Sequence, residues 1–146
     1  MILIIVAAVI ILDQLTKFIA TRNLLLNHPF DIIGGIFSLT LVHNRGAAFG
    51  ILKNQIYLFV FTSAFAVILI YSELRNNKHR TVYSVALSLI LAGALGNLID
   101  RLLFGYVIDF LDFHFWPVFN VADSAITIGA VMLGWTLLFT KEKNVS

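Results

Sequence analysis

Four long apolar stretches alternate with more polar segments along the chain. Each stretch is long enough to cross a bilayer as a helix, because about 20 helical residues span a hydrocarbon core of ~30 Å. The pattern predicts membrane-spanning helices at about residues 2–21, 55–73, 81–103 and 121–140. Both prolines, Pro29 and Pro117, fall outside these stretches, as uninterrupted helices require. We expect residues 1–146 to form one integral membrane domain.

Two segments between the spans show the alternation of apolar and polar residues that is typical of strands. They are GIFSLTLVHN (35–44) and FLDFHFW (110–116). Single strands would be unstable, so we expect the two to pair in a small sheet at one membrane surface. Asp112 falls within the second alternation, which favours a place in the sheet or an interface for it. The predicted fold is an all-α membrane protein with four transmembrane helices and a small extracytoplasmic sheet.

Composition supports a membrane protein and excludes several kinds of site. The chain is 60% hydrophobic and 12% charged, with a mean hydropathy of +0.93, whereas soluble domains carry about 25% charged residues. A net charge of +2 without a basic run does not indicate nucleic-acid binding. The absence of cysteine excludes disulfides, zinc–thiolate sites and a cysteine nucleophile.

The distribution of basic residues predicts the orientation in the membrane, because Lys and Arg concentrate in cytoplasmic loops. The segment 74–80 and the C-terminal tail hold Arg75, Lys78, Arg80, Lys141 and Lys143. The other side holds Arg22, Arg45, Lys53 and Arg101, spread over longer segments. This density difference favours cytoplasmic termini, with residues 22–54 and 104–120 facing outward.

The first span contains two charges, Asp13 and Lys17, within IILDQLTKFI. A charge in hydrocarbon costs at least a few kcal/mol even on mild insertion scales. The two residues are four apart with the acid first, so they share a helix face and can form an ion pair. We interpret the pair as a structural strut inside the helix bundle in preference to a direct part in chemistry.

The third span has small residues on one face, at Ser84, Ser88, Ala92 and Gly96, where helix backbones can approach closely. The same face continues to Asp100, with Asn97 and Arg101 beside it. Two interpretations stay open for this end. It is either a packing seam closed by an ion pair between Asp100 and Arg101, or part of a functional site.

The fourth span begins with FNVADSAI, in which Asn120 and Asp123 lie one helical turn apart. Asp123 alone is best explained as a cap of the helix N-terminus. Its surroundings change that interpretation, because the polar residues of the spans and outer loops gather at the outer end of the predicted bundle. They are Asp13, Lys17, Asn44, Arg45, Asn97, Asp100, Arg101, Asp109, Asn120 and Asp123. Ionisable residues inside a membrane are candidates for function.

Four motifs together resemble the signature blocks of the lipoprotein signal peptidase (signal peptidase II) family of bacterial aspartic intramembrane proteases. They are DQLTK (13–17), NRGAAFG (44–50), GALGNLIDR (93–101) with YVIDF (106–110), and FNVADSAI (119–126). The resemblance covers essentially the whole chain, and it implies an outer sheet that forms a cradle. It implies cleavage of prolipoproteins before a diacylglyceryl-modified cysteine, at the outer face of the bacterial cytoplasmic (inner) membrane.

The resemblance also implies roles for individual residues. The catalytic aspartates would be Asp109 and Asp123, separated by a compact loop. The supporting polar residues would be Asp13, Lys17, Asn44, Gly93, Asn97, Arg101 and Asn120. No metal or cofactor is implied. The expected partners are lipid-modified signal peptides and membrane lipid, and the protein is expected to be a monomer.

Other chemistries have weaker support in the sequence. The four histidines, His28, His43, His79 and His114, have no metal-ligand spacing, and Ser124 lacks the GxSxG elbow of serine hydrolases. Two alternatives of another class are a proton- or ion-conducting protein that uses the carboxylates as a relay, and a helical assembly factor. A relay needs polar residues through the full membrane depth, whereas the inner halves of the third and fourth spans are apolar.

Overall fold

The computed structural model describes residues 1–46, 55–76 and 81–139, which include four long helices. The helices are α1 (Ile2–Asn23), α2 (Ile56–Asn76), α3 (Thr81–Phe104) and α4 (Val121–Phe139). All four are long and apolar enough to cross a membrane. The four predicted spans are therefore confirmed within a few residues at each end. Residue 140 lies outside the described residues, as do Lys53, Lys78, Arg80, Lys141 and Lys143, on which part of the orientation argument depends.

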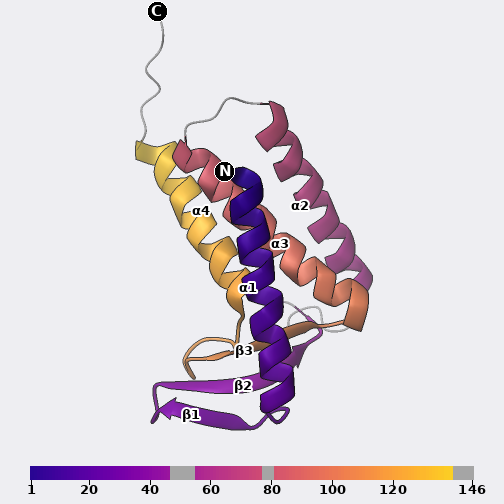
Figure 1. Cartoon of the computed structure of the whole chain (residues 1–146), viewed down its shortest axis with the longest axis vertical. Helices are drawn as coiled ribbons and strands as arrows, with labels where there is room; N and C mark the ends of the chain where they lie inside the picture. The colour runs from indigo at the N-terminus through magenta and orange to yellow at the C-terminus, as the bar shows by residue number, and fades with distance from the viewer. Residues whose placement is uncertain (47–54, 77–80, 140–146) are drawn as a thin grey trace, which may run out of the picture.

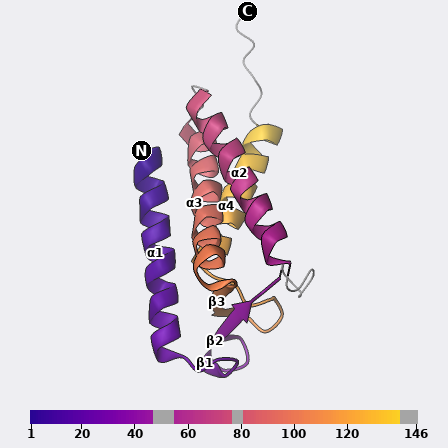
Figure 2. The same cartoon turned by 90° about the vertical axis from the view of Figure 1, so that its right-hand side faces the viewer.

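Helix α3 is the centre of the bundle and packs against α1, α2 and α4 (Figures 1 and 2). Its closest approach to α4 depends on glycines in both helices. A methyl group on Gly93 would overlap the carbonyl oxygen of Ala122, and one on Gly129 would lie 2.6 Å from the carbonyl oxygen of Ala86. Small residues of α3 thus allow close backbone packing, but they do so at Gly93 and Ala86, whereas Gly96 of the predicted face lies against Asp13 of α1.

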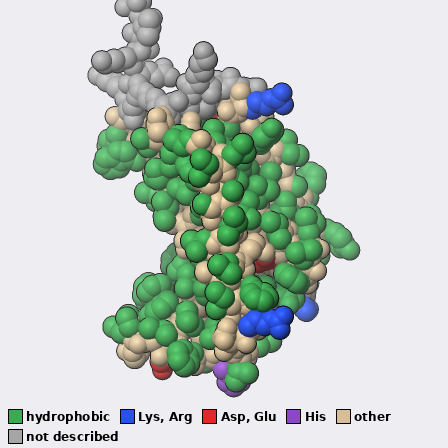
Figure 3. Space-filling view, in the orientation of Figure 1, with side chains coloured by type: hydrophobic (Ala, Val, Ile, Leu, Met, Phe, Trp, Pro, Cys, Tyr) green, Lys and Arg blue, Asp and Glu red, His purple; other side chains and the backbone are tan. Residues whose placement is uncertain are grey.

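The outer surfaces of the helices are apolar, and hydrophobic side chains cover most of the helical part of the molecule in Figure 3. In α2, large residues such as Phe61, Ile68 and Leu69 are exposed on the protein surface. A soluble domain rarely exposes so much contiguous apolar surface, whereas a bilayer covers it. The protein is therefore a multi-pass membrane protein.

A three-stranded antiparallel sheet lies at one end of the bundle, with β2 (Phe37–Asn44) between β1 (Pro29–Ile33) and β3 (Val107–Asp112). The predicted pairing of two strands is confirmed for β2 and β3. The predicted strand 110–116 is wrong in its bounds, because the chain turns after Asp112. There the Asp112 carboxylate accepts a hydrogen bond from the His114 backbone N–H (2.9 Å), and His114 adopts a positive φ of 61°. Asp112 itself lies in the sheet, as expected.

Strand β1 has no counterpart in the sequence prediction. All five of its residues are exposed, so no alternation of apolar and polar residues marks it. It begins at Pro29 and forms the outer edge of the sheet, which is where a strand tolerates proline.

The turn from α3 into β3 brings the C-terminal end of α3 and the sheet together. Gly105 follows the helix with a positive φ of 76°, and its N–H donates to the Arg101 carbonyl (3.1 Å), which closes the helix end. The chain then returns as β3 over the end of the bundle. A small core of Ala20, Leu41, Ile108 and Phe110 joins α1 to the sheet. The start of α1 and the end of α4 lie at the opposite end of the molecule (Figure 1).

Candidate active site

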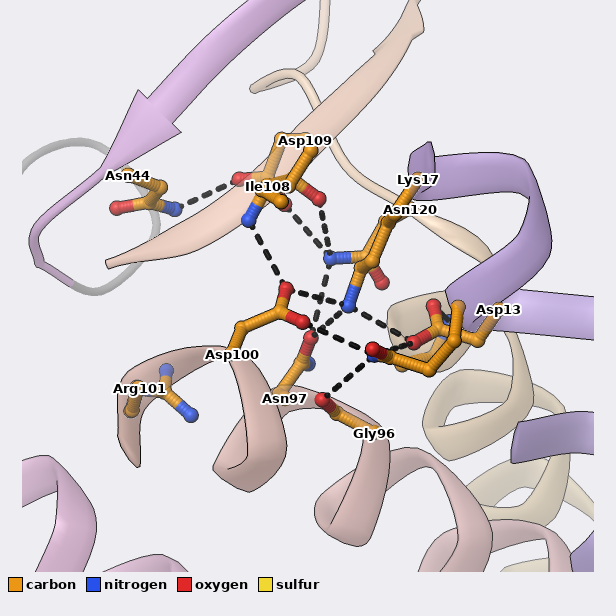
Figure 4. A network of polar contacts seen from close by, with 12 residues as sticks. Asp13, Lys17, Asn44, Gly96, Asn97, Asp100, Arg101, Ile108, Asp109 and Asn120 are labelled. Carbon is orange, nitrogen blue, oxygen red and sulfur yellow. Dashed lines mark hydrogen bonds and ion pairs between the residues drawn. The ribbon is translucent and has the colours of Figure 1, made fainter. Parts of the chain in front are cut away.

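Lys17 and two carboxylates form a buried ion cluster at the sheet end of the bundle (Figure 4). The Lys17 Nζ lies 2.8 Å from Asp13 Oδ2 and 2.8 Å from Asp100 Oδ2. At most 1% of any of the three residues is exposed. The predicted pair of Asp13 and Lys17 is present, and Asp100 forms its ion pair with Lys17 and not with Arg101. Of the two interpretations left open for this end of α3, the ion pair between Asp100 and Arg101 is therefore wrong.

The two carboxylates of this cluster also hold backbone groups of other elements. Asp13 Oδ1 accepts from the Ala122 N–H in the first turn of α4 (2.8 Å), and Asp100 Oδ2 accepts from the Ile108 N–H in β3 (3.1 Å). Gln14 Nε2 donates to Asp100 Oδ1 (2.9 Å). Gln14 is not among the residues predicted from the sequence, although an amide next to a charge inside a membrane span is a signal for a buried polar contact. The cluster joins α1, α3, α4 and β3.

Asn120 and Asp123 form a reciprocal cap at the start of α4. Asn120 Oδ1 accepts from the Asp123 N–H (2.9 Å), while Asp123 Oδ2 accepts from the Asn120 N–H (3.3 Å). This is the geometry of a capping box, with Asn in the place of Ser or Thr and Asp in the place of Glu. The cap uses only one oxygen of Asp123, so capping and a second role are compatible.

The side-chain amides of Asn97 and Asn120 connect the ion cluster to two further carboxylates. Asn97 Oδ1 accepts from Lys17 Nζ (3.1 Å), and Asn97 Nδ2 donates to Asp123 Oδ1 (2.8 Å). Asn120 Nδ2 donates to Asp109 Oδ1 (2.7 Å) and also lies 3.1 Å from Asn97 Oδ1. Asn120 therefore contacts both Asp109 of β3 and Asp123 of α4.

Asp109 lies in β3 with 1% of its surface exposed. Its Oδ2 accepts from Asn44 Nδ2 in the neighbouring strand (2.9 Å), and the Asn44 side chain is itself held by the Gly46 N–H (3.0 Å). Burial, and then the nearby charge of Asp123, raises the pKa of Asp109 to about 7. The hydrogen bonds from Asn44 and Asn120 and the charge of Lys17 act in the opposite direction and only partly offset this. Asp109 therefore exchanges a proton near neutral pH.

The remaining predicted residues differ in how closely they join this network. Arg101 lies beside it, with its guanidinium 3.4 Å from Ser63 Oγ and 5.3 Å from the centre of the Phe59 ring, both in α2. Gly93 contributes space, since it allows α4 to approach α3 at Ala122. Arg45 is exposed and is not brought into the network.

Two adjoining cavities open next to Asp123. One, of about 240 Å³, is lined by polar groups that include Asn44, Asn97 and Arg101. The other, of about 380 Å³, is lined mainly by apolar and aromatic side chains, among them Phe113, Phe115 and Ile128. The two cavities share Trp116, Phe119, Asp123 and Thr127. Asp123 thus borders the space where a ligand can enter, whereas Asp109 lies buried beside Asn44 and Asn120.

The described residues also bear on the two alternative chemistries, metal binding and a trans-membrane relay. Among these residues no three His, Cys, Asp or Glu side chains are grouped as metal ligands. His28 and His114 are exposed, and His79 lies outside the described residues. Farther along the bundle the buried polar side chains are hydroxyls bonded within their own helix, such as Ser88 to the Ser84 carbonyl (2.6 Å) and Thr136 to the Met132 carbonyl (2.8 Å).

Known proteins are similar to this chain along nearly its whole length. The family model described as Signal peptidase (SPase) II matches residues 5–139. The chain belongs to the signal peptidase II family. It is 47% identical over 141 residues to the lipoprotein signal peptidase of Caldanaerobacter subterraneus subsp. tengcongensis, a match that covers 95% of this chain and 97% of that protein. It is 48% identical over 131 residues to the lipoprotein signal peptidase of Moorella thermoacetica, covering 89% and 87% of the two chains.

Solved structures support the same fold. The chain is similar, with a TM-score of 0.88 and 34% identity, to a bacterial membrane enzyme solved by the in meso method, over 99% of this chain and 94% of that one. The family resemblance read from the four motifs is confirmed. Of those motifs, residues 47–50 lie outside the described structure. The roles assigned to individual site residues stay predictions.

Proposed function

We propose that this signal peptidase II is an aspartic endopeptidase in which Asp109 and Asp123 act together on lipoprotein precursors. Family membership carries the reaction class, which is removal of the signal peptide from a prolipoprotein. The observation that carries the aspartic mechanism is the joint contact of Asn120 with both carboxylates, through its side-chain amide to Asp109 and its backbone N–H to Asp123, combined with a pKa of about 7 for Asp109. Two carboxylates held this way share one proton near neutral pH.

Peptide hydrolysis requires a base for the attacking water and an acid for the carbonyl oxygen and the leaving amine. The ionised carboxylate takes a proton from water, whose oxygen attacks the scissile carbonyl carbon. The protonated carboxyl group donates to the carbonyl oxygen, which gives a tetrahedral intermediate. The C–N bond then breaks as a proton passes to the amine nitrogen. Because the pair shares its proton, the two roles are not assigned to separate residues.

The two cavities provide a place for such a substrate. The apolar cavity next to Phe113, Phe115 and Ile128 suits an apolar signal-peptide segment or lipid chain, and the polar cavity leads to Asp123. Arg101 and Asn97 line the polar cavity, where they can donate to substrate carbonyl groups. We propose that cleavage occurs before the diacylglyceryl-modified cysteine, and that a single chain suffices, since one chain provides all of these groups.

The site is proposed to face the outer side of the cytoplasmic membrane. The network and the sheet lie at the bundle end opposite the start of α1 and the end of α4 (Figure 1). Cytoplasmic termini, favoured by the basic residues along the sequence, place that end outward. A reporter fused after Phe139 should be active only in the cytoplasm. Activity of the reporter only in the periplasm would place the site on the inner side and contradict this topology.

Cleavage by purified variants tests the mechanism. Detergent-purified protein should cleave a diacylglyceryl-modified prolipoprotein and leave the unmodified precursor intact. Asp109→Asn and Asp123→Asn should each lose about 10²–10⁴-fold in turnover, because the amide cannot exchange the proton. The double variant should be hardly worse than either single one, since the two residues act as a unit.

Asp112→Asn is the matched control, as it changes an acidic residue of the same strand that bonds only within the sheet end, to Thr40 and His114. It should keep most of the activity. Chelators and serine-directed reagents should leave cleavage unchanged. Substantial turnover by either Asp109→Asn or Asp123→Asn, with the fold checked by circular dichroism, would remove that residue from the mechanism.

A further inference from the structure

A third cavity, of about 680 Å³, lies between the C-terminal half of α1, strand β2 and the turn from α3 into β3. Apolar side chains form most of its wall, among them Phe18, Leu24, Leu25, Leu41 and Phe104. It shares no lining residue with the two cavities beside Asp123. It is therefore a separate feature that the proposed cleavage reaction does not use.

The lining also has polar groups, but apolar side chains form the larger part of it; the residues that carry polar groups are Gln14, Lys17, Thr21, His43 and Tyr106. The Lys17 Nζ is turned inward to Asp13 and Asp100, and Gln14 Nε2 donates to Asp100 and to the Gly96 carbonyl. The ammonium group of Lys17 and the side-chain Nε2 group of Gln14 are thus occupied by the buried network. What these two residues can present to the cavity is the aliphatic part of each side chain. The cavity therefore favours a hydrocarbon occupant.

A cation lies at the same end of α1. Arg22 is exposed in the last turn of the helix, and its guanidinium carbon is 5.2 Å from the centre of the Phe18 ring, which lines the cavity. Thr21, next to Arg22, also lines the cavity. Because α1 crosses the membrane and ends at Asn23, Arg22 lies at the level of lipid headgroups. A guanidinium there matches a phosphate group in charge and geometry.

We infer that this cavity binds one phospholipid with an anionic headgroup, with hydrocarbon between α1 and the sheet and the phosphate at Arg22. The cavity holds part of the hydrocarbon of such a lipid, and the rest of the molecule stays in the bilayer. The cavity opens on a helix whose outer face is covered by lipid, so the occupant comes from the bilayer itself. This binding is independent of the proposed cleavage and is measured without substrate.

Native mass spectrometry of the full-length protein in detergent tests the inference. The probes are dioleoyl phosphatidylglycerol and dioleoyl phosphatidylcholine, which have the same acyl chains and different headgroups. The wild-type protein should retain one phosphatidylglycerol in preference to phosphatidylcholine. Arg22→Gln should weaken retention of phosphatidylglycerol about fivefold, the effect expected for one basic group at a membrane surface. Thr21→Trp, which places a bulky ring in the cavity wall, should weaken retention of phosphatidylglycerol.

Arg75→Gln is the matched control, because it removes the same charge from the last turn of α2. It should retain phosphatidylglycerol like the wild type. Equal losses in Arg22→Gln and Arg75→Gln would show general charge attraction and overturn the site. Unchanged retention by Thr21→Trp would show that the lipid does not occupy the cavity. Equal retention of both lipids by the wild type would contradict headgroup recognition at Arg22.

Discussion

Asp13 and Asp100 differ from Asp109 and Asp123 in how the protein neutralises them, although all four carboxylates belong to one network. Asp13 and Asp100 each lie 2.8 Å from the ammonium group of Lys17. Asp109 and Asp123 are instead contacted by neutral amides, Asp109 by Asn44 and Asn120 and Asp123 by Asn97.

In the proposed mechanism, this difference separates the supporting carboxylates from the catalytic ones. A buried carboxylate with a cation in contact holds its neighbours in place, as Asp13 does for the first turn of α4. A buried carboxylate that receives only amide hydrogen bonds, close to a second one, keeps a proton at a higher pH, as Asp109 does. Charge compensation, more than burial, therefore distinguishes the two pairs.

Removal of Lys17, the cation in contact with Asp13 and Asp100, should have the largest effect on the stability of the protein. Lys17→Met leaves Asp13 and Asp100 buried without a cation, which should cost about 3–5 kcal/mol of unfolding free energy. Thermal unfolding in detergent measures this. Unchanged stability would mean that the ion cluster is not a strut.

A triple variant sharpens the same comparison. Asp13→Asn with Lys17→Met still leaves Asp100 uncompensated, so this double variant should remain unstable. Adding Asp100→Asn should recover much of the loss, because no buried charge remains in the cluster. Recovery that is already complete in the double variant would show that Asp100 does not depend on Lys17.

Asp109, which has no cation in contact among the described residues, should make the stability of the protein depend on pH. The pKa of Asp109 is raised from 3.8 to about 7, so the folded state binds this proton more tightly than the unfolded chain does. Its stabilising effect is complete below about pH 4 and is lost as the pH rises through 7, a change of up to about 4 kcal/mol. Asp109→Asn should flatten the dependence of the melting temperature on pH over this window. An equally steep profile in Asp109→Asn would assign the effect to another group.

The close packing of α3 against α4 holds both pairs of carboxylates in place, and it should be sensitive to a single added methyl group. Gly93→Ala should cost about 1–3 kcal/mol, because the new methyl overlaps the Ala122 carbonyl and pushes the start of α4, with Asp123, away from α3. Gly134→Ala is the matched control in a membrane helix, since nothing lies within 4 Å of the position that its Cβ would take. Equal melting temperatures for the two variants would contradict the close packing at Gly93.

The helices and most members of the polar network could be predicted from the sequence because their signals are local. Span length and hydropathy mark the four helices, and the spacing of Asp13 and Lys17 predicts their ion pair. The motif resemblance pointed to Asp109 and Asp123, whose amide contacts the structure then supplied.

What could not be predicted depends on contacts between distant segments. The partner of Asp100 is Lys17, more than eighty residues away, and nothing local favours it over the adjacent Arg101. Strand β1 is exposed on both faces, so burial leaves no pattern in its sequence. The turn at His114 depends on a side-chain hydrogen bond that alternation alone does not reveal.

The most direct test compares one Asp→Asn change in each pair, with turnover and melting temperature measured on the same purified samples. Asp13→Asn should melt at a lower temperature yet keep turnover within about tenfold of the wild type, since it loses support and not the exchanging proton. Asp109→Asn should melt at or above the wild-type temperature at pH 8 and lose nearly all turnover. A well-folded but inactive Asp13→Asn, or an active Asp109→Asn, would contradict the division between the two pairs.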